Sequence, residues 1–269
     1  MEINKVYNED NITLISRIPD DFIDLTVTSP PYDNLRSYKG FTFDFETLSK
    51  ELYRVTKPGG VVVWIVGDST KKGSETGASF MQALHFMEIG FNLHDTMIYA
   101  KNNYVPLTHN RYEQQFEYMF VFSKGKPKTF NPIKIPSKNA GKINRPTHRR
   151  FTDDLVKTSG YGKEVKKEKI KPNIWFYSIG NNRSSNDKIA YKHPAIFPEQ
   201  LVKDHIISWS NKGDLVFDPF MGSGTTAVSS LELGRNYIGV EIAEEYVKIS
   251  NERIRNHIIL KEGINGLNF

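Results

Sequence analysis

Apolar residues alternate along the chain between short continuous runs and stretches with helical spacing. Strands are predicted at residues 3–7, 24–28, 61–66, 94–100, 117–123, 214–217 and 237–241. Helices are predicted at residues 45–55, 79–89, 198–209, 225–233 and 243–256, and a shorter helical stripe ends before Pro19. Strands separated by helices are typical of an open α/β sheet.

Two neighbouring segments carry this prediction most clearly. Leu48, Leu52 and Val55 follow helical spacing, and the sequence KPGG at residues 57–60 ends that helix. Residues 61–66 (VVVWIV) form a continuous apolar run, which suits a strand buried on both faces of a parallel sheet. This run is far shorter than the roughly 20 apolar residues of a membrane-spanning helix. The N-terminus also lacks the pattern of a signal peptide, so we expect no membrane segment.

Basic residues are concentrated in one segment between the two patterned regions. Residues 124–172 hold 15 Lys and Arg against four Asp and Glu, a net charge of +11, while the rest of the chain holds 21 against 27, a net charge of −6. The segment is rich in Pro, Gly and Asn and has little apolar periodicity, so we expect loops. A phosphate-contacting insert and a solvated linker both fit this charge. Aromatic residues such as Phe151, Tyr161 and Trp175 favour the insert.

The chain contains no cysteine. Disulfides, thiolate zinc sites, iron–sulfur clusters and cysteine nucleophiles are therefore excluded. Any covalent chemistry would need another residue type.

A glycine-rich loop follows a predicted strand in DLVFDPFMGSGTT, residues 214–226. The strand ends at Asp218, and Gly222 and Gly224 form a tight loop before a helix. Free N–H groups at the helix start, with the acid Glu241 at the end of the next strand, suit a cofactor that contains a nucleoside. The loop lacks the third glycine of the dinucleotide fingerprint and the lysine of a Walker loop. An acid at position 218 instead suits a cationic ligand, such as an amino group or a sulfonium.

A second motif, TSPPY at residues 28–32, follows the strand at 24–28. Its two prolines remove backbone donors and hold the chain extended, which leaves carbonyls and the Ser29 hydroxyl as acceptors. Two acceptors suit a planar amino group, and the ring of Tyr32 suits stacking on the heterocycle that carries it. Alone, the motif would also fit a rigid proline turn with a core tyrosine. Beside the cofactor loop, it predicts a substrate site.

Together these motifs resemble those of the amino-directed DNA methyltransferases that use S-adenosylmethionine. TSPPY is similar to their catalytic (D/N/S)-P-P-(Y/F/W) motif, DPFMGSGTT to their cofactor motif, and KHPAIFPEQL (residues 192–201) to a further cofactor segment. The order of catalytic motif, basic insert and cofactor motif is that of the family's beta group. The resemblance covers roughly residues 3–255.

This resemblance implies a fold and a division of the chain. The fold would be a doubly wound, mostly parallel, seven-stranded Rossmann-like sheet of the methyltransferase type, circularly permuted so that residues 3–7 form a strand beside the cofactor-motif strands. Residues 1–123 and 191–269 would form the catalytic domain. Residues 124–190 would form an inserted basic target-recognition region that binds double-stranded DNA.

The resemblance also implies site residues, and no metal among them. The catalytic residues would be Ser29, Pro30, Pro31 and Tyr32. The cofactor-binding residues would be Asp10, Lys192, His193, Pro194, Asp218, Pro219, Phe220, Gly222, Ser223, Gly224, Thr225 and Glu241. The DNA-binding residues would be Lys138, Lys142, Arg145, Arg149 and Arg150. Glu117 matches a common family position without a role that we can assign, and Asp68 suits a helix or turn cap at least as well as a ligand contact.

The predicted reaction is methyl transfer from S-adenosylmethionine to the exocyclic N4 amino group of cytosine in DNA, within a restriction-modification system. Serine at the first position of the catalytic motif favours cytosine N4 in this family, and aspartate favours adenine N6. Adenine N6 methylation is therefore the main alternative. Methylation of RNA or of a protein glutamine, and a catalytically inactive DNA-binding relative, are weaker alternatives. Methylation of cytosine carbon-5 is excluded, because that reaction needs a cysteine thiolate.

The expected setting follows from the same resemblance. We expect a cytoplasmic protein of bacterial, archaeal or phage origin that acts as a monomer or homodimer. A cognate restriction endonuclease is a candidate partner.

Overall fold

The computed structural model describes residues 1–31, 44–104, 110–145, 147–149, 155–157, 160–180, 183–185 and 187–265, with the backbone alone at 147–149, 155–157 and 261–265. The chain divides into two compact units. The main unit comprises Met1–Asn131 and Asn173–Phe269, and the insert unit comprises Pro132–Pro172.

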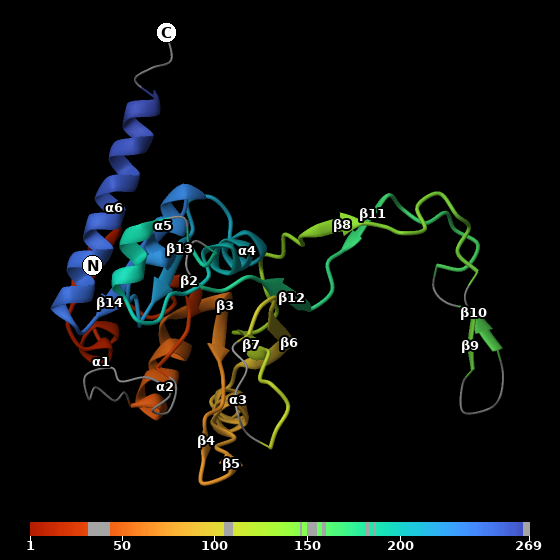
Figure 1. Ribbon diagram of the computed structural model, residues 1–269, viewed down its shortest axis with the longest axis horizontal. Helices are drawn as coiled ribbons and strands as arrows, with labels where there is room; N and C mark the ends of the chain where they lie inside the picture. The colour runs from red at the N-terminus through yellow and green to blue at the C-terminus, as the bar shows by residue number, and fades with distance from the viewer. Residues whose placement is uncertain are drawn as a thin grey trace. The chain divides into compact units, whose positions relative to one another are not determined.

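An eight-stranded sheet forms the centre of the main unit (Figure 1). The strands lie in the order β1 (Lys5–Asn8), β14 (Asn236–Glu241), β13 (Leu215–Asp218), β2 (Ile23–Thr28), β3 (Thr56–Val66), β7 (Phe116–Ser123), β6 (Asn92–Lys101) and β12 (Ile174–Tyr177). β7 runs antiparallel to both of its neighbours, and every other pair in this sheet is parallel. The predicted α/β class with a mostly parallel sheet is confirmed.

The strand at the N-terminus lies beside strands from the C-terminal part of the chain. β1 pairs in parallel with β14, with Val6 opposite Gly239, and β14 pairs with β13. Residues 5–8 therefore complete the sheet next to the two strands that flank the glycine loop, as the permuted order predicts.

The eighth strand, β12, corrects the expected count of seven. It pairs in parallel with β6, with Trp175 opposite Tyr99, and both aromatic side chains are buried. The Tyr177 hydroxyl donates a 2.6 Å hydrogen bond to Asp204 on a neighbouring helix, and burial raises the pKa of this tyrosine well above its usual range. Residues 173–190, which the sequence-based division assigned to the insert, thus belong to the main unit, where Trp175 and Tyr177 of β12 are buried.

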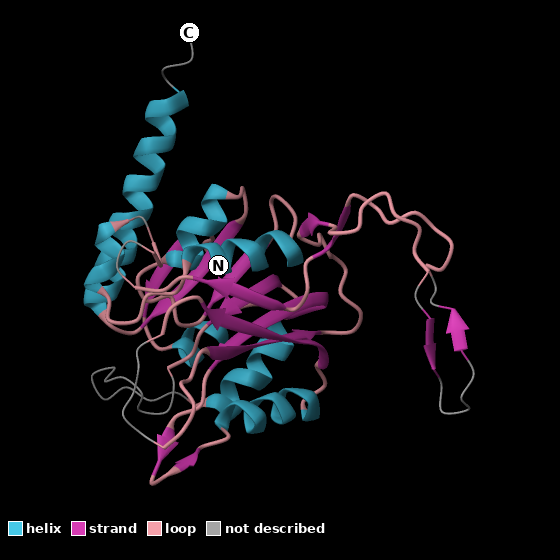
Figure 2. Ribbon diagram, turned by 45° about the vertical axis from the view of Figure 1, so that its right-hand side comes forward, coloured by secondary structure: helices cyan, strands magenta, loops and turns pink. Residues whose placement is uncertain are grey.

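Helices cover both faces of the sheet (Figure 2). One face carries α1 (Asn11–Ile15), α2 (Phe45–Val55) and α3 (Ala78–Glu88), and the other carries α4 (Glu199–Trp209), α5 (Thr225–Glu232) and α6 (Glu244–Asn265). A short 3₁₀ helix, η1 (Lys188–Lys192), precedes α4. None of the described helices is both long enough and apolar enough to cross a membrane.

Apolar side chains from the helices and the sheet form the core. On the face covered by α1 to α3, Leu14, Leu48, Trp64 and Phe86 are completely buried. On the opposite face, a second cluster joins β1 and β14 to α5 and α6. The apolar positions that predicted strands and helices are therefore the positions that hold the layers together.

Three local features differ from the sequence-based prediction. β3 begins at Thr56, directly after α2, rather than at residue 61, and the backbone groups of Gly59 and Gly60 pair with Lys124. α6 continues to residue 265 rather than 256, past exposed apolar residues that break the helical pattern. A small hairpin, β4 (Thr70–Lys71) with β5 (Ser74–Glu75), was not predicted.

The insert unit is a two-stranded antiparallel ribbon, which corrects the expectation of loops. β8 (Lys134–Pro136) pairs with β11 (Glu168–Ile170), and β9 (Thr147–Arg149) pairs with β10 (Leu155–Lys157). Between these pairs, a bridge and several backbone hydrogen bonds continue the ladder. No residue of 132–145 or 160–172 is buried, so the ribbon lacks the apolar alternation from which a strand is predicted.

Candidate active site

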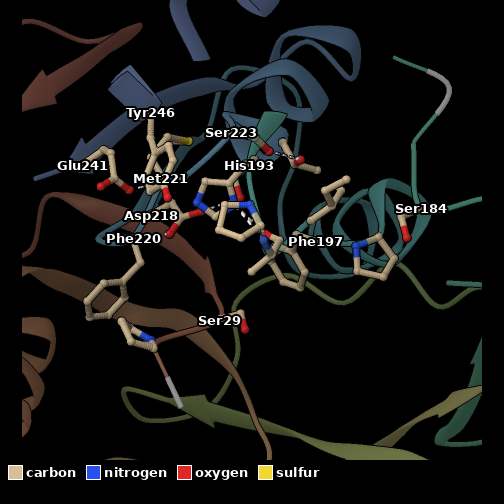
Figure 3. Close-up of a pocket in the computed structure, with 18 of the residues that line it drawn as sticks. Ser29, Ser184, His193, Phe197, Asp218, Phe220, Met221, Ser223, Glu241 and Tyr246 are labelled. Carbon is tan, nitrogen blue, oxygen red and sulfur yellow. Dashed lines mark hydrogen bonds between the residues drawn. The ribbon is translucent and has the colours of Figure 1, made fainter. Parts of the chain in front are cut away.

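A cavity of about 750 Å³ opens in the main unit at the carboxyl ends of the parallel strands (Figure 3). Its wall is formed by the residues that follow β2, β13 and β14, together with the segment His193–Pro198 before α4. Open α/β sheets bind ligands at this edge, and the volume is in the range of small-molecule and cofactor sites.

Most of the predicted site residues line this one cavity. They are Asp10, Ser29, Pro31, His193, Pro194, Asp218, Pro219, Phe220, Gly222, Ser223, Thr225 and Glu241. Pro30 is buried and does not line the cavity, and Tyr32 lies outside the described residues. Lys192 and Gly224 are not part of the wall. The contacts of these residues with a ligand stay predictions.

Asp218 ties the two sequence motifs together. Its Oδ1 accepts hydrogen bonds from the Thr28 hydroxyl at 2.7 Å and from the Phe220 backbone N–H at 3.0 Å. Its Oδ2 accepts a 2.6 Å bond from the Thr226 hydroxyl. Burial raises the pKa of this carboxyl above its usual value, although the three hydrogen bonds oppose that shift. Thr28 directly precedes Ser29, so Asp218 connects the end of β2 to the glycine loop, a role that sequence reasoning missed.

Glu241 holds the glycine loop from the other side. Its Oε2 accepts a 2.9 Å hydrogen bond from the Gly222 N–H, and its Oε1 accepts one of 2.9 Å from the Ala243 N–H. Burial raises the pKa of Glu241, and the two N–H donors oppose that shift. The predicted contact with a ribose remains compatible with this geometry, because a carboxylate offers more lone pairs than these two bonds use.

The two loop glycines serve different purposes. Gly222 has a φ of +52°, and a Cβ there would lie 3.2 Å from the His193 ring, so the loop and the His193 segment approach closely. Gly224 has a φ of +83°, and a Cβ there would lie 2.7 Å from the Cβ of Ser250 on α6. Position 224 therefore needs glycine to fit against a helix, which explains why it is absent from the cavity wall.

Some of the remaining predicted residues line the cavity, and others form contacts with neighbouring helices. The exposed Lys192 forms a 3.5 Å ion pair with Glu252 on α6 rather than reaching the cavity. Asp10 lines the cavity and also caps α1, because its Oδ1 accepts bonds from the N–H groups of Ile12 and Thr13. Asp68 lines the cavity as well and accepts bonds from the Ser79 N–H and hydroxyl in the first turn of α3. The interpretation of Asp68 as a cap thus agrees with its hydrogen bonds.

On the other side of Ser29, the cavity wall is charged as well. The sheet order places β3, β7 and β6 beyond β2, away from the glycine loop. From these strands Lys101 and Glu117 line the cavity and form a 2.8 Å ion pair, with both side chains largely buried. Tyr99 lies beside them, 5.9 Å from the Lys101 ammonium. Sequence reasoning noted Glu117 without a role and missed Lys101, because the two residues are paired only in the folded sheet.

A model of a protein family described as DNA methylase, N6_N4_Mtase, matches residues 23–252, which is most of the chain. The chain belongs to this DNA methylase family.

Individual relatives agree with the family assignment. The chain is similar to the orphan methyltransferase M.BamHII of Bacillus amyloliquefaciens, with 56% identity over 93% of this chain and 95% of that protein. Among solved structures, the PvuII DNA methyltransferase, described as cytosine-N4-specific, aligns with a TM-score of 0.67 and 22% identity, over 93% of this chain and 85% of that one.

A second similar solved structure is a complex with S-adenosyl-L-methionine. A modification methylase of Thermus thermophilus, in complex with S-adenosyl-L-methionine, aligns with a TM-score of 0.61 and 23% identity, over 94% of this chain and 95% of that one. At these identities, the two structural matches establish a shared fold.

The predicted DNA-binding residues belong to the insert unit. Lys138, Lys142 and Arg145 are exposed on the ribbon. Arg149 is the last residue of β9, where only the backbone is described, and Arg150 lies outside the described residues. Their contact with DNA stays a prediction.

Proposed function

We propose that this chain transfers a methyl group from S-adenosylmethionine to the exocyclic N4 amino group of cytosine in double-stranded DNA. The observation that carries this proposal is the shared cavity. Ser29 of the catalytic motif and the carboxylates of Asp218 and Glu241 line the same cavity, and the Thr28–Asp218 hydrogen bond joins the two motifs.

The acceptor and aromatic groups that line the cavity suit S-adenosylmethionine. Asp10, Asp218 and Glu241 would supply carboxylates for a ligand that carries a sulfonium and an amino group, and Phe220 would offer an aromatic face to its adenine. His193 and Pro194 would lie over the methionine end. When bound, the cofactor supplies an electrophilic methyl group.

The residues around Ser29 orient the acceptor. The target base must leave the duplex stack to bring its amino nitrogen into a buried cavity. The Ser29 hydroxyl and the Pro30 carbonyl would accept hydrogen bonds from the two amino hydrogens, which localises the nitrogen lone pair toward the methyl group. Transfer would form the N–CH3 bond as the S–CH3 bond breaks, with S-adenosylhomocysteine as the leaving group, and one amino proton would pass to solvent. Tyr32 stacks on the base. The chain thus contributes position and electrostatics rather than a nucleophile.

The charged pair beyond Ser29 supports cytosine as the base. Beside its N4 amino group, cytosine presents two acceptors, N3 and O2. The Lys101 ammonium is a donor on the part of the cavity wall where that edge would lie, and Glu117 holds it in place. On its Watson–Crick edge, adenine presents only the ring acceptor N1 beside its N6 amino group, with a C–H group at position 2 where cytosine has O2, so it offers this donor one acceptor instead of two.

The ribbon supports duplex DNA as the substrate. Residues 132–172 carry 12 Lys and Arg against four Asp and Glu. The major groove of B-DNA admits a two-stranded β-ribbon, and basic side chains on such an element reach phosphates and base edges. We assign recognition of the target sequence to this ribbon, including Lys138, Lys142, Arg145, Arg149 and Arg150.

The biological setting has two candidates. Restriction-modification would pair the chain with an endonuclease, whereas the similarity to a protein called an orphan methyltransferase favours action without one. Cleavage of unmodified DNA by a lysate of the source cells, and protection of that DNA by this protein, would decide for restriction-modification.

Nucleoside analysis tests the proposed reaction. The protein is expressed in a host that lacks amino-methylated bases, and its DNA is digested and analysed by mass spectrometry. We expect N4-methylcytosine, which is absent when Tyr32→Ala is expressed instead. N6-methyladenine would establish the adenine alternative. No modified base, together with inactive purified protein, would refute the proposed activity.

A further inference from the structure

One face of α6 packs against the cofactor side of the cavity. Tyr246, Ser250 and Arg253 follow one another at helical spacing and are all at least nine-tenths buried. The Tyr246 ring lies 4.2 Å from the ring of His193, and Ser250 contacts the loop at Gly224. α6 follows the last sequence motif and was predicted only as a helix.

Arg253 makes the most specific contacts of this face. Its Nη1 donates hydrogen bonds to the Ser223 carbonyl at 2.7 Å, and to the hydroxyls of Ser223 and Thr225 at 3.2 Å each. Its Nε donates a 2.8 Å bond to Oδ2 of Asp187. The Oδ1 of Asp187 accepts a 2.9 Å bond from the Ile189 N–H, which begins η1.

A single side chain thus joins two walls of the cavity. Ser223 and Thr225 belong to the glycine loop, and η1 leads directly into His193 and Pro194. Arg253 itself is not on the cavity wall, so it acts on a ligand only through these neighbours. The two walls are separate in sequence, yet they approach closely, since a Cβ at Gly222 would lie 3.2 Å from the His193 ring.

The stability of the fold does not explain why position 253 holds an arginine. The Arg253 side chain is completely buried, and its Nη2 has no hydrogen-bond partner within the described part of the chain. A buried ion pair can often be replaced by apolar residues of similar size without loss of stability. The cost of burying an incompletely bonded guanidinium therefore suggests that its role lies in the geometry of the cavity.

We propose that Arg253 is a positioning residue that sets the affinity for S-adenosylmethionine by holding the glycine loop and the η1 segment at a fixed separation. This inference rests on the proposed function, because it assigns those two walls to the cofactor. Removal of the guanidinium frees both walls to move, so the cofactor must order them when it binds. Catalysis with cofactor bound should change little, because Ser29 follows β2 and belongs to neither of these two walls.

Calorimetric titration with S-adenosylhomocysteine, which binds without turnover, tests the proposal. Arg253→Met keeps an unbranched, flexible side chain but is shorter and has no donors, and we expect its Kd to rise by about tenfold to a hundredfold. Arg253→Lys keeps one donor and should lie between Arg253→Met and the wild type. At saturating S-adenosylmethionine, kcat should stay within about threefold of the wild type, so the defect appears in KM for the cofactor.

Arg235→Met is the matched control. Arg235 is also a buried arginine, but it donates to the Ser210 hydroxyl and carbonyl and to the Leu233 carbonyl, away from the cavity. This variant should lose stability and keep its affinity for S-adenosylhomocysteine. If Arg253→Met does not fold, Asp187→Asn is the variant that tests the proposal. Asp187 is partly exposed, and loss of its carboxylate removes only the contact between Arg253 and the η1 segment.

The outcomes separate the two proposals. An unchanged Kd in Arg253→Met or, failing that, in Asp187→Asn would overturn the positioning role, as would a loss of kcat without a rise in Kd. An equal rise in Kd for Arg235→Met would also overturn it, since any buried arginine would then have the same effect. A wild-type protein that binds no S-adenosylhomocysteine would refute the cofactor assignment itself.

Discussion

The main unit and the insert unit are built on different principles. In the described part of the main unit, the eight strands and six α-helices bury apolar side chains on both faces of one sheet, and the buried Asp218 is held by several hydrogen bonds. In the insert unit, a two-stranded ribbon has no buried residue at 132–145 or 160–172. A two-stranded ribbon without a core is marginally stable by itself.

This contrast indicates how the two units divide the work. Burial gives the main unit fixed distances, which a cofactor site and an amino-orienting motif need. Exposure and positive charge give the insert unit a surface that suits phosphate contacts, whose strength depends on salt. Substitutions in the main unit should therefore affect turnover or cofactor affinity, and substitutions in the ribbon should affect DNA affinity and its dependence on salt.

The largest effect is expected at Ser29. Ser29→Ala removes one acceptor for the amino group and should lower kcat about a hundredfold. The KM for S-adenosylmethionine should change less than threefold, because the glycine loop is untouched. Steady-state kinetics with labelled cofactor measure both. Ser74→Ala, in the exposed β4–β5 hairpin, is the control. A rise in cofactor KM with unchanged kcat would place Ser29 in the cofactor site instead.

A slightly smaller loss of methylation activity is expected when Lys101 is substituted. Lys101→Met removes the donor and leaves Glu117 largely buried without its ion pair, so kcat/KM for DNA should fall about tenfold to a hundredfold. Binding of S-adenosylhomocysteine should stay near that of the wild type. Single-turnover methylation and calorimetry distinguish the two quantities. Equal loss of cofactor affinity would contradict the assignment of this wall to the base.

Asp218 should change stability in a pH-dependent way. Burial raises its pKa above 3.8 in the folded state, so folding favours the protonated carboxyl. The contribution of the protonated Asp218 to the free energy of unfolding is complete at pH values below the pKa of this group in the unfolded chain. This contribution is lost as the pH rises through the pKa of the group in the folded protein. Asp218→Asn cannot titrate. The free energy of unfolding of the wild type minus that of the variant should therefore fall as the pH rises from about 4, the ordinary pKa of an aspartate, through neutral pH.

Denaturant unfolding of both proteins across that pH range measures this difference. A difference that stays constant, or that rises with pH, would show that Asp218 is not penalised by burial. Its hydrogen bonds to Thr28, Phe220 and Thr226 would then outweigh desolvation.

The smallest effect is expected in the insert unit. Arg149→Gln with Arg150→Gln should weaken DNA binding and reduce the slope of log K against log salt by about 0.9 for each phosphate that is no longer neutralised. Cofactor affinity should not change. Lys248→Gln, an exposed lysine on α6, is the control for charge alone. An unchanged slope would show that these two arginines do not bind phosphates, and an equal effect in the control would show a general charge effect.

The same contrast explains what could be predicted from the sequence. Periodic apolar positions predicted α2 at its observed bounds and most strands of the sheet to within a few residues, because burial selects the side chains at those positions. Sequence motifs located Ser29 and Glu241, which line one cavity. The ribbon was predicted as loops, because its strands bury nothing and leave no pattern to detect.

Contacts between distant residues were beyond the reach of sequence reasoning. The Thr28–Asp218 bond and the Lys101–Glu117 pair depend on which strands are neighbours in the sheet. Arg253 lies outside every motif, and only the packing of α6 brings it to Ser223. Lys192 belongs to a motif, yet it pairs with Glu252 instead of lining the cavity.

Transfer of label by the purified protein tests the central claim most directly. The protein is incubated with S-adenosylmethionine labelled in the methyl group and unmethylated double-stranded DNA, and the nucleosides are separated and counted. We predict label in N4-methylcytosine with the wild type and a large loss with Ser29→Ala. Label in no nucleoside, from a folded protein that binds S-adenosylhomocysteine, would contradict the assignment of this cavity to amino-group methylation of DNA.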